Sequence, residues 1–441
     1  MNDALVLRGA ALFADPTRGV DVVVSDGVVR EVAAAGSVQT DAAVVDLDGL
    51  LLMPGAIDPH VHPIHDETFA SVGNAAVFGG ITTICNQLYP DPGEPFGTAI
   101  DRMAGQGADG TADFAAHLRW DRSRTAADVL EGAERGALSI KVFLAHPDKS
   151  IQASLGELAI AMTAARDAGL DTLVHCELGD VVDRMLDLGH ASRETLEDVH
   201  HWRSTDNEAA AVTAAALVAR GTGARLYVVH ASCADALGAA TAARSRGTAL
   251  SVETCPHYAF LDVSSAPSGG PGFVLPPLRT LDDQRAVRNA IVSGLVDTMG
   301  SDHCGHGEAS KPHEIAASKA GLPGLEAMLP LLIDAALGDD AWLPRQRLLE
   351  LVCEGPSRVF GLGVKGRLRP GYDADVVAID PAGSTTLGAQ AFHDAAGYSP
   401  YQGRNLRGSI ARVWRRGDLV VDGGHAVVEG GGRLIPRSRE A

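Results

Sequence analysis

The chain has 441 residues, of which 46% are hydrophobic and 21% are charged, a composition that is ordinary for a globular enzyme. This length accommodates a barrel of roughly 250 residues together with a smaller module. The formal net charge of −19 argues against nucleic acid and anionic membrane as partners, because both favour clustered lysine and arginine.

The first residues of the chain carry no basic stretch followed by a long apolar core, so we expect no signal peptide. We also find no run of roughly 18 or more apolar residues, and therefore expect no membrane span. The six cysteines are scattered through apolar runs without a Cys-x-x-Cys pair, which is typical of reduced, buried thiols. Together these features predict a cytoplasmic protein.

Residues 1–53 alternate short β-rich runs with turns, and Ser25-Asp26-Gly27 is typical of a hairpin turn. Similar short β-rich runs occur towards the C-terminus, at residues 375–379, 411–414 and 418–421. The simplest explanation is one module built from both ends of the chain. We therefore predict that segments 1–53 and 366–441 form a small β-sandwich domain, with a central domain inserted between them.

The central segment, residues 54–365, alternates strand-like and helix-like stretches. Eight apolar runs are candidate strands: Ala56–His62, Ile81–Leu88, Asp113–Trp120, Leu138–Ala145, Asp171–Cys176, Arg225–Ala231, Ala249–Pro256 and Asp297–His303. Stretches with helical spacing lie between most of them, such as 155–168, 207–219 and 233–246. This alternation predicts a (β/α)8 TIM-type barrel. The alternative, a doubly wound open sheet, lacks the Gly-x-Gly-x-x-Gly expected after its first strand.

The first central strand ends in two histidines, His60 and His62. Side chains two residues apart on a strand point to the same side, so both imidazoles can bind one metal ion. The alternative is a pair of histidines at the edge of a loop. Other polar residues lie on later strands: Lys141 within the fourth, and His175, His230 and Asp302 at strand ends. Because active sites of such barrels lie at the C-terminal ends of the strands, these residues should meet at one mouth.

Lys141 stands inside an apolar strand, where a lysine is costly unless it reaches solvent or is neutralised. One interpretation is an outward lysine that reaches solvent between the helices. The other is a lysine that has reacted with carbon dioxide, whose carboxylate would bridge two metal ions. The second interpretation brings a site with two divalent cations closer to neutrality than a free ammonium group would.

Six motifs in order resemble those of the cyclic amidohydrolases, the group that contains hydantoinases (dihydropyrimidinases), allantoinases and dihydroorotases. They lie at His60–His62, Ser139–Phe143, Leu173–His175, Val228–His230, Glu253–Tyr258 and Gly300–His303. The similarity covers almost the whole chain, including residues 371–377 and 398–403. These motifs are specific for the group and weak for the substrate.

The resemblance implies two divalent metal ions, usually zinc. The residues that would bind them are His60, His62 and Asp302 for one ion, His175 and His230 for the other, and carboxylated Lys141 as the bridge. It also implies that a metal-bridging hydroxide opens a cyclic amide, while Asp302 passes the proton to the leaving nitrogen. Because relatives tend to be homo-oligomers, we expect a dimer or tetramer.

The residues expected around the substrate differ from those usual in dihydroorotases and from those usual in hydantoinases. Dihydroorotases usually carry an arginine soon after His-x-His and an asparagine after the second strand; here residues 63–66 hold no arginine, and Tyr89 follows that strand. Hydantoinases usually place a tyrosine at the position of His146 and an asparagine at that of Ala320. The Pro256-His257 pair is more similar to the corresponding residues of allantoinases and dihydroorotases than to those of hydantoinases. We therefore expect a hydantoinase-like or allantoinase-like hydrolase, with a dihydroorotase or a cyclic imide hydrolase as the alternative.

Three histidines are candidate contacts to the substrate: His146, His257 and His306. The alternatives are a loop position for His146 and His306 and a core role for His257. His303 is expected to be structural, and Asp58 a hydrogen-bond partner at the strand end. The alternative to an enzyme is a non-enzymatic scaffold protein that is similar to dihydropyrimidinase. Such scaffolds generally lose metal ligands, whereas this chain retains all six.

Overall fold

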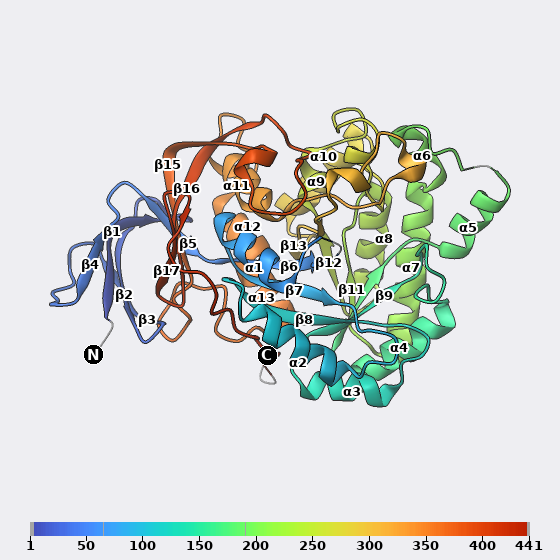
Figure 1. Ribbon diagram of the computed structural model, residues 1–441, viewed down its shortest axis with the longest axis horizontal. Helices are drawn as coiled ribbons and strands as arrows, with labels where there is room; N and C mark the ends of the chain where they lie inside the picture. Colours follow the sequence, from blue (N-terminus) through green and yellow to red (C-terminus); the bar gives the residue numbers. More distant parts are fainter. Residues whose placement is uncertain (1–3, 65, 190, 439–441) are drawn as a thin grey trace.

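The computed structural model describes residues 4–64, 66–189 and 191–438. The expectation about a signal peptide therefore falls partly on positions outside the described residues, and so does His65 in the segment that follows His-x-His. Two units lie side by side along the long axis of the molecule (Figure 1). One is a β-sheet that contains the described start of the chain, and the other is a barrel surrounded by helices.

The barrel consists of parallel strands that follow one another in chain order. They are β6 (Ala56–His62), β7 (Ile81–Leu88), β8 (Asp113–Arg119), β9 (Ser139–Phe143), β10 (Asp171–His175), β11 (Leu226–Val228), β12 (Leu250–Thr254), β13 (Thr298–Met299) and β14 (His303–Cys304). The last two are pieces of one predicted strand, and β14 pairs with β6, which closes the sheet. The predicted (β/α)8 barrel is therefore confirmed.

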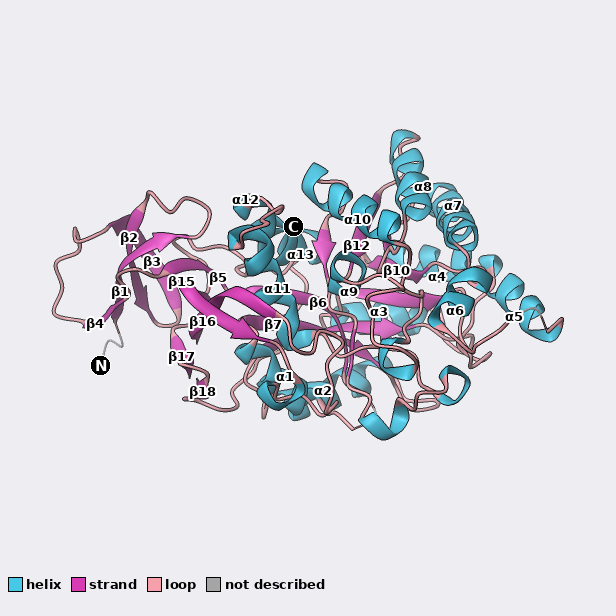
Figure 2. Cartoon of the chain, turned by 90° about the horizontal axis from the view of Figure 1, so that it is seen from above, coloured by secondary structure: helices cyan, strands magenta, loops and turns pink. Residues whose placement is uncertain are grey.

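Helices cover the outside of the barrel (Figure 2). Their bounds are α1 (Phe69–Phe78), α2 (Phe96–Gly107), α3 (Ala126–Glu134), α4 (Leu155–Asp167), α5 (Gly179–Asp187), α6 (Leu196–Trp202), α7 (Thr205–Thr222), α8 (Ala234–Ser245), α9 (Pro256–Phe260), α10 (Leu281–Ser293), α11 (Leu325–Leu337), α12 (Arg345–Leu349) and α13 (Gly355–Phe360). Four of them, α1, α3, α4 and α6, begin with a capping box, in which a Ser or Thr and the third helical residue exchange hydrogen bonds. None of the described helices combines the length and the apolar character needed to cross a membrane.

Several barrel strands end before their predicted limits, and two depart most from the predicted ranges. Strand β11 stops at Val228, and the eighth strand is interrupted between Met299 and His303. In each case a non-glycine residue lies in the left-handed region, His230 with φ of 42° and Asp302 with φ of 50°. Because this conformation ends the extended backbone, it shortens the strands and turns both side chains out of the regular alternation.

The described residues of the two chain ends share a second sheet. Its strands are β1 (Leu5–Leu12), β2 (Gly19–Ser25), β3 (Val28–Ala34), β4 (Ala43–Asp46), β5 (Leu51–Pro54), β15 (Val376–Thr386), β16 (Asn405–Arg415), β17 (Asp418–Asp422) and β18 (His425–Ala426). Antiparallel pairing of β5 with β15 joins the two ends, as predicted. Strand β4 pairs with the first half of β1 and β5 with its last residues. The sheet therefore branches at β1, which fits a small sandwich.

Two details of this sheet bear on the sequence predictions. The turn between β2 and β3 has positive φ at Asp26 and Gly27, 55° and 73°, as a type I′ hairpin turn requires. The last described residues leave the sheet and return to the barrel, where Ile435 N–H donates to Phe114 O at 2.7 Å. The division into 1–53, 54–365 and 366–441 stays a prediction, and within the third segment residues 433–438 lie against the barrel.

The barrel interior is apolar near its N-terminal end, where Ile57, Ala115, Leu173 and Tyr227 belong to one buried cluster. A larger apolar cluster fills the space between the strands and the helices. All six cysteines are buried and free, as predicted. The polar residues that the sequence singles out lie further along the same strands, at the C-terminal mouth of the barrel.

Candidate metal centre

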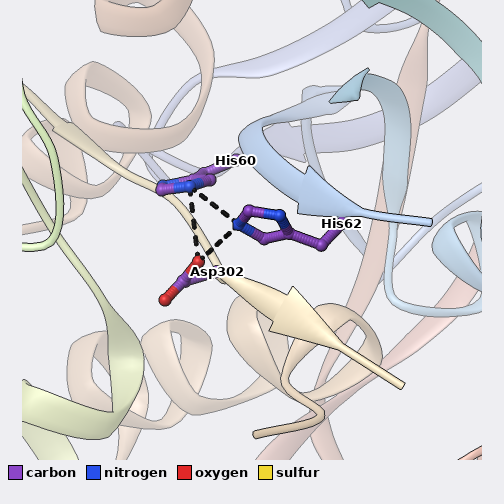
Figure 3. Close-up of side chains that lie close together, drawn as sticks. All are labelled: His60, His62 and Asp302. Carbon is purple, nitrogen blue, oxygen red and sulfur yellow. Dashed lines mark hydrogen bonds and ion pairs between the residues drawn. The ribbon is translucent and has the colours of Figure 1, made fainter. Parts of the chain in front are cut away.

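Three predicted ligands meet at the ends of the first and eighth barrel strands. His60 Nε2 lies 3.1 Å from His62 Nε2, and Asp302 Oδ1 lies 3.3 Å from the former and 3.0 Å from the latter. Figure 3 shows the two rings and the carboxylate turned towards a common point. All three residues are buried. The left-handed backbone at Asp302 turns its carboxylate into this group.

The other three predicted ligands adjoin this group. Lys141 Nζ lies 3.2 Å from His60 Nε2, and the Lys141 side chain is buried, with only 1% of its surface exposed. His175 Nδ1 lies 3.1 Å from His230 Nε2, and the His230 ring stacks on that of His60 at 5.7 Å between centroids. The structure therefore brings all six predicted residues to one site, and the outward interpretation of Lys141 is wrong.

Carboxylates behind two of the histidines determine which ring nitrogen carries the proton. His60 Nδ1 lies 2.7 Å from Glu253 Oε1, and His175 Nε2 lies 2.8 Å from Glu177 Oε2. A neutral imidazole that donates from one nitrogen presents a lone pair at the other. Consequently His60 Nε2 and His175 Nδ1, the atoms that face the site, are free to bind a cation. Arg203 in turn holds Glu177 through two hydrogen bonds of 2.7 and 2.8 Å.

His62 has a phenol behind it where His60 and His175 have a carboxylate. Tyr89 follows β7, and its hydroxyl lies 2.5 Å from His62 Nδ1. If His62 Nε2 is to offer a lone pair, Nδ1 must carry the proton and donate it to the Tyr89 oxygen. The hydroxyl hydrogen of Tyr89 then remains available for another acceptor at the mouth.

The surroundings shift the pKa of two members of the site. Burial lowers the pKa of Lys141 to about 8, which raises the fraction of the neutral amine that can react with carbon dioxide. Burial raises the pKa of Asp302, but the neighbouring His60 and His62 outweigh this effect and hold that pKa well below its usual value. Asp302 is therefore ionised at neutral pH.

The donor set fits divalent cations. His60 Nε2, His62 Nε2 and Asp302 Oδ1 lie within 3.3 Å of one another, close enough for all three to bind one cation. Imidazole nitrogen and carboxylate oxygen are ligands that borderline metals such as zinc accept. The carboxylates behind the histidines are a further common feature of metal sites.

The three candidate substrate contacts lie in different surroundings. His257 is buried beside Asp302, and its Nε2 has no hydrogen-bond partner among the described residues. His146 is half-buried beside Phe143, and its Nδ1 accepts a hydrogen bond from Asp148 N–H at 3.0 Å. His306 is buried and donates from Nε2 to Ala320 O at 3.0 Å, which ties two loop segments together. Their contacts with a substrate stay predictions.

Two further residues behave as the sequence indicates. The Asp58 carboxylate accepts hydrogen bonds from the backbone N–H groups of His60 and Ser301, each at 3.0 Å, and thus joins the first and eighth strands. His303 Nε2 lies 2.9 Å from Glu67 Oε2. Burial lowers the pKa of His303, but Glu67 outweighs it and raises that pKa to about 9. Both residues support the site from outside.

Sequence reasoning missed the residues behind the histidines. Glu253 belongs to a recognised motif, yet nothing in its local pattern indicates that it contacts His60. Glu177 follows His175 by two residues on an apolar strand end, and a buried acid at that spacing is the signal that could have found it. For Tyr89 the sequence shows only that a residue other than the asparagine of dihydroorotases follows the second strand.

Comparisons with known proteins agree with this architecture. A model of the family described as "Amidohydrolase family" matches residues 51–420. An allantoinase of Rubrobacter xylanophilus is 32% identical over 99% of this chain and 98% of its own length. A D-hydantoinase of Geobacillus stearothermophilus is 32% identical, with 95% and 92% of the two chains covered. Relatives named dihydroorotase match as well.

A solved structure gives the same result for the fold. The L-hydantoinase (dihydropyrimidinase) of Arthrobacter aurescens superimposes with a TM-score of 0.91, at 27% identity and with 99% of this chain and 100% of that chain covered. Sequence and structural similarity thus extend over both the barrel and the terminal sheet. The chain therefore belongs to the amidohydrolase family.

Proposed function

We propose that the protein hydrolyses a C–N bond in a cyclic amide or ureide, with two divalent metal ions, zinc by preference, at the barrel mouth. The residues proposed to bind them are His60, His62, Asp302, His175, His230 and carboxylated Lys141 as the bridge. The observation that carries the proposal is the convergence of these six buried side chains. The names of the related proteins, allantoinase and hydantoinase, support this class of substrate.

Carboxylation of Lys141 is supported by its surroundings. The amine is buried, its pKa is lowered by burial to about 8, and it forms no ion pair with any described residue. A buried ammonium group without a carboxylate partner is costly, whereas a carboxylated amine would share the cations with its neighbours. Lys141 therefore fits the bridging role better than a structural one.

In the proposed mechanism, the ions when bound would polarise the amide carbonyl and lower the pKa of the attacking water. Asp302 is ionised and accepts the proton that the water releases, then delivers it to the leaving ring nitrogen. Glu253 and Glu177 keep the His60 and His175 rings in the required tautomer and orientation. The Nε2 atom of His257, which has no hydrogen-bond partner among the described residues, would contact a polar group of the substrate beside Asp302.

We expect hydantoinase-like or allantoinase-like activity, with a dihydroorotase or a cyclic imide hydrolase as the alternative. The test combines metal analysis of the purified protein with hydrolysis assays on hydantoin, dihydrouracil, allantoin, dihydroorotate and succinimide. Stoichiometric metal and turnover of at least one compound are the expected results. A chain that binds no metal and hydrolyses none of them would instead behave as a scaffold.

Lys141→Ala tests the bridging role directly. We expect this variant to lose most of its metal and its turnover, because the proposed bridge between the two ions is gone. Metal content is measured by mass spectrometry after gel filtration, beside circular dichroism to verify folding. A folded Lys141→Ala protein with full metal content and full activity would exclude the bridge. The expectations of a dimer or tetramer and of a cytoplasmic location stay predictions.

A further inference from the structure

Arg119 is the last residue of β8 and stands at the mouth of the barrel. Two residues earlier on this strand, His117 contacts Pro59 O inside the barrel, and Ala115 belongs to the interior apolar cluster. Because side chains alternate along a strand, Arg119 faces the same interior side one step nearer the mouth. Its register partner on β9 is Lys141, a proposed metal ligand.

The guanidinium of Arg119 lies over the ring of Tyr89, with 5.3 Å between Cζ and the ring centroid. The Tyr89 hydroxyl in turn contacts His62 Nδ1 at 2.5 Å. Arg119 is thus separated from a proposed metal ligand by a single side chain. A cation held over an aromatic face keeps a defined orientation while its N–H groups remain free to donate.

Arg119 has no hydrogen bond or ion pair with any side chain in the described part of the protein, and its Nε is buried without a partner. The next arginines on the chain differ in this respect, since Arg122 pairs with Glu157 at 2.9 Å and Arg124 with Asp121 at 3.4 Å. A half-buried guanidinium presents five donors, and leaving them unpaired costs free energy. A ligand with a planar anionic group would satisfy them.

We propose that Arg119 binds a carboxylate of the substrate, so that the preferred substrates are cyclic amides or ureides that carry a carboxylate substituent. This inference rests on the proposed function, which supplies the cyclic amide at the same mouth. A guanidinium matches a carboxylate with two parallel hydrogen bonds. The Tyr89 hydroxyl, whose oxygen accepts from His62, can donate its own hydrogen to the same anion. Arg119 and Tyr89 together form the carboxylate subsite.

Matched substrate pairs test this inference. Dihydroorotate and dihydrouracil share one ring and differ in a carboxylate, as do hydantoin-5-acetic acid and hydantoin. The wild type should show the higher kcat/KM for the carboxylated member of at least one pair. Arg119→Met should lower that kcat/KM by about 10- to 100-fold and change the neutral member by less than about threefold. Arg119→Lys should retain part of the preference, because it keeps the charge without the planar fork.

Arg122→Met is the matched control, since Arg122 lies three residues further on and is exposed and paired. Arg122→Met should leave the kcat/KM for both members of each substrate pair unchanged. Two results would overturn the inference while leaving the proposed function intact. One is an Arg119→Met variant that loses kcat/KM equally for the carboxylated and the neutral substrate, and the other is a wild type with the higher kcat/KM for the neutral substrates. Metal content and circular dichroism show whether Arg119→Met is folded and loaded.

A binding measurement separates this inference from the proposed function. Orotate and uracil also differ in a carboxylate, and calorimetry gives their dissociation constants without turnover. Tighter binding of orotate that is lost in Arg119→Met supports the carboxylate subsite even if the wild type hydrolyses none of the compounds tested. Equal affinities for orotate and uracil, or orotate binding that Arg119→Met leaves unchanged, would contradict it.

Discussion

At the scale of single residues, Glu253 contacts a histidine of each proposed ion without being a ligand itself. Its Oε1 accepts from His60 Nδ1 at 2.7 Å and from His230 N–H at 3.1 Å, while Oε2 accepts from the Tyr227 hydroxyl at 2.7 Å. One buried carboxylate therefore orients a ligand of each proposed ion. The geometry of the two halves of the site depends on its charge and on its two acceptor oxygens.

Glu253→Gln should weaken metal binding by about 10- to 100-fold, because the amide offers one acceptor and turns a donor towards groups that also donate. The readout is the dissociation constant for zinc in competition with a chelator. Glu134→Gln, on the exposed end of α3, is the control and should leave this constant unchanged. Wild-type zinc affinity in folded Glu253→Gln would show that the carboxylate does not orient the ligands.

The proposed ligands could be predicted from the sequence because the histidines and Asp302 stand at the ends of apolar runs and Lys141 is a charged residue inside one. Their supporting residues could not be predicted in the same way. Glu253 is 193 positions from His60, and Tyr89 is 27 positions from His62, so no local pattern indicates these contacts. Arg119 ends a strand as the ligands do, but its position over Tyr89 depends on the register of β7 against β8.

At the scale of elements, the strand and helix limits were predictable where periodicity is strong. Strands β6 and β7 begin and end at the predicted residues, and α4 ends one residue earlier than its predicted segment. The largest departures fall on β11 and the eighth strand, where His230 and Asp302 adopt left-handed backbone. Histidine and aspartate tolerate this conformation, yet apolar periodicity carries no signal for it.

The start of α4 gives a prediction for helix stability. Ser154 Oγ accepts from Glu157 N–H at 3.2 Å, and the Glu157 carboxylate accepts from Ser154 N–H at 2.6 Å. Ser154→Ala should lower the free energy of unfolding by about 1 kcal/mol, because it leaves a helix N–H without its acceptor. Ser245→Ala, at the exposed end of α8, is the control. Urea titration measures the unfolding midpoint of each variant. Equal midpoints for Ser154→Ala and the wild type would contradict the capping role.

At the scale of the whole molecule, an ionic cluster joins the barrel to the terminal sheet. Asp113, at the start of β8, contacts Lys365 Nζ at 2.6 Å and also Arg416, and Lys365 contacts Asp375 at 2.8 Å. Burial raises the pKa of Asp113, but Lys365 and Arg416 outweigh it and hold that pKa below its usual value of 3.8. The ionised form of Asp113 thus stabilises the contact between the two units.

Asp113→Asn should lower the free energy of unfolding at pH 7 by about 3–5 kcal/mol, because it leaves buried cations with one partner fewer. Since the pKa of Asp113 is lower in the folded state, its contribution is present above the unfolded value of 3.8 and lost as the pH falls below it. The difference from the wild type should therefore shrink in acid. Denaturant titrations from pH 7 to pH 3 measure this, with the exposed Asp101→Asn as control. A difference that stays constant over this range would contradict the assignment.

The joining of β5 to β15 has a consequence for biosynthesis. Pro54 lies opposite Val376, so an early strand must wait for a partner that leaves the ribosome more than 300 positions later. Closing so long a loop is slow, and contacts of this kind form late. The nascent chain accordingly exposes an unpaired β-edge while the intervening segment is being made. During that interval the emerging polypeptide is most exposed to aggregation, and a chaperone that covers the edge would protect it.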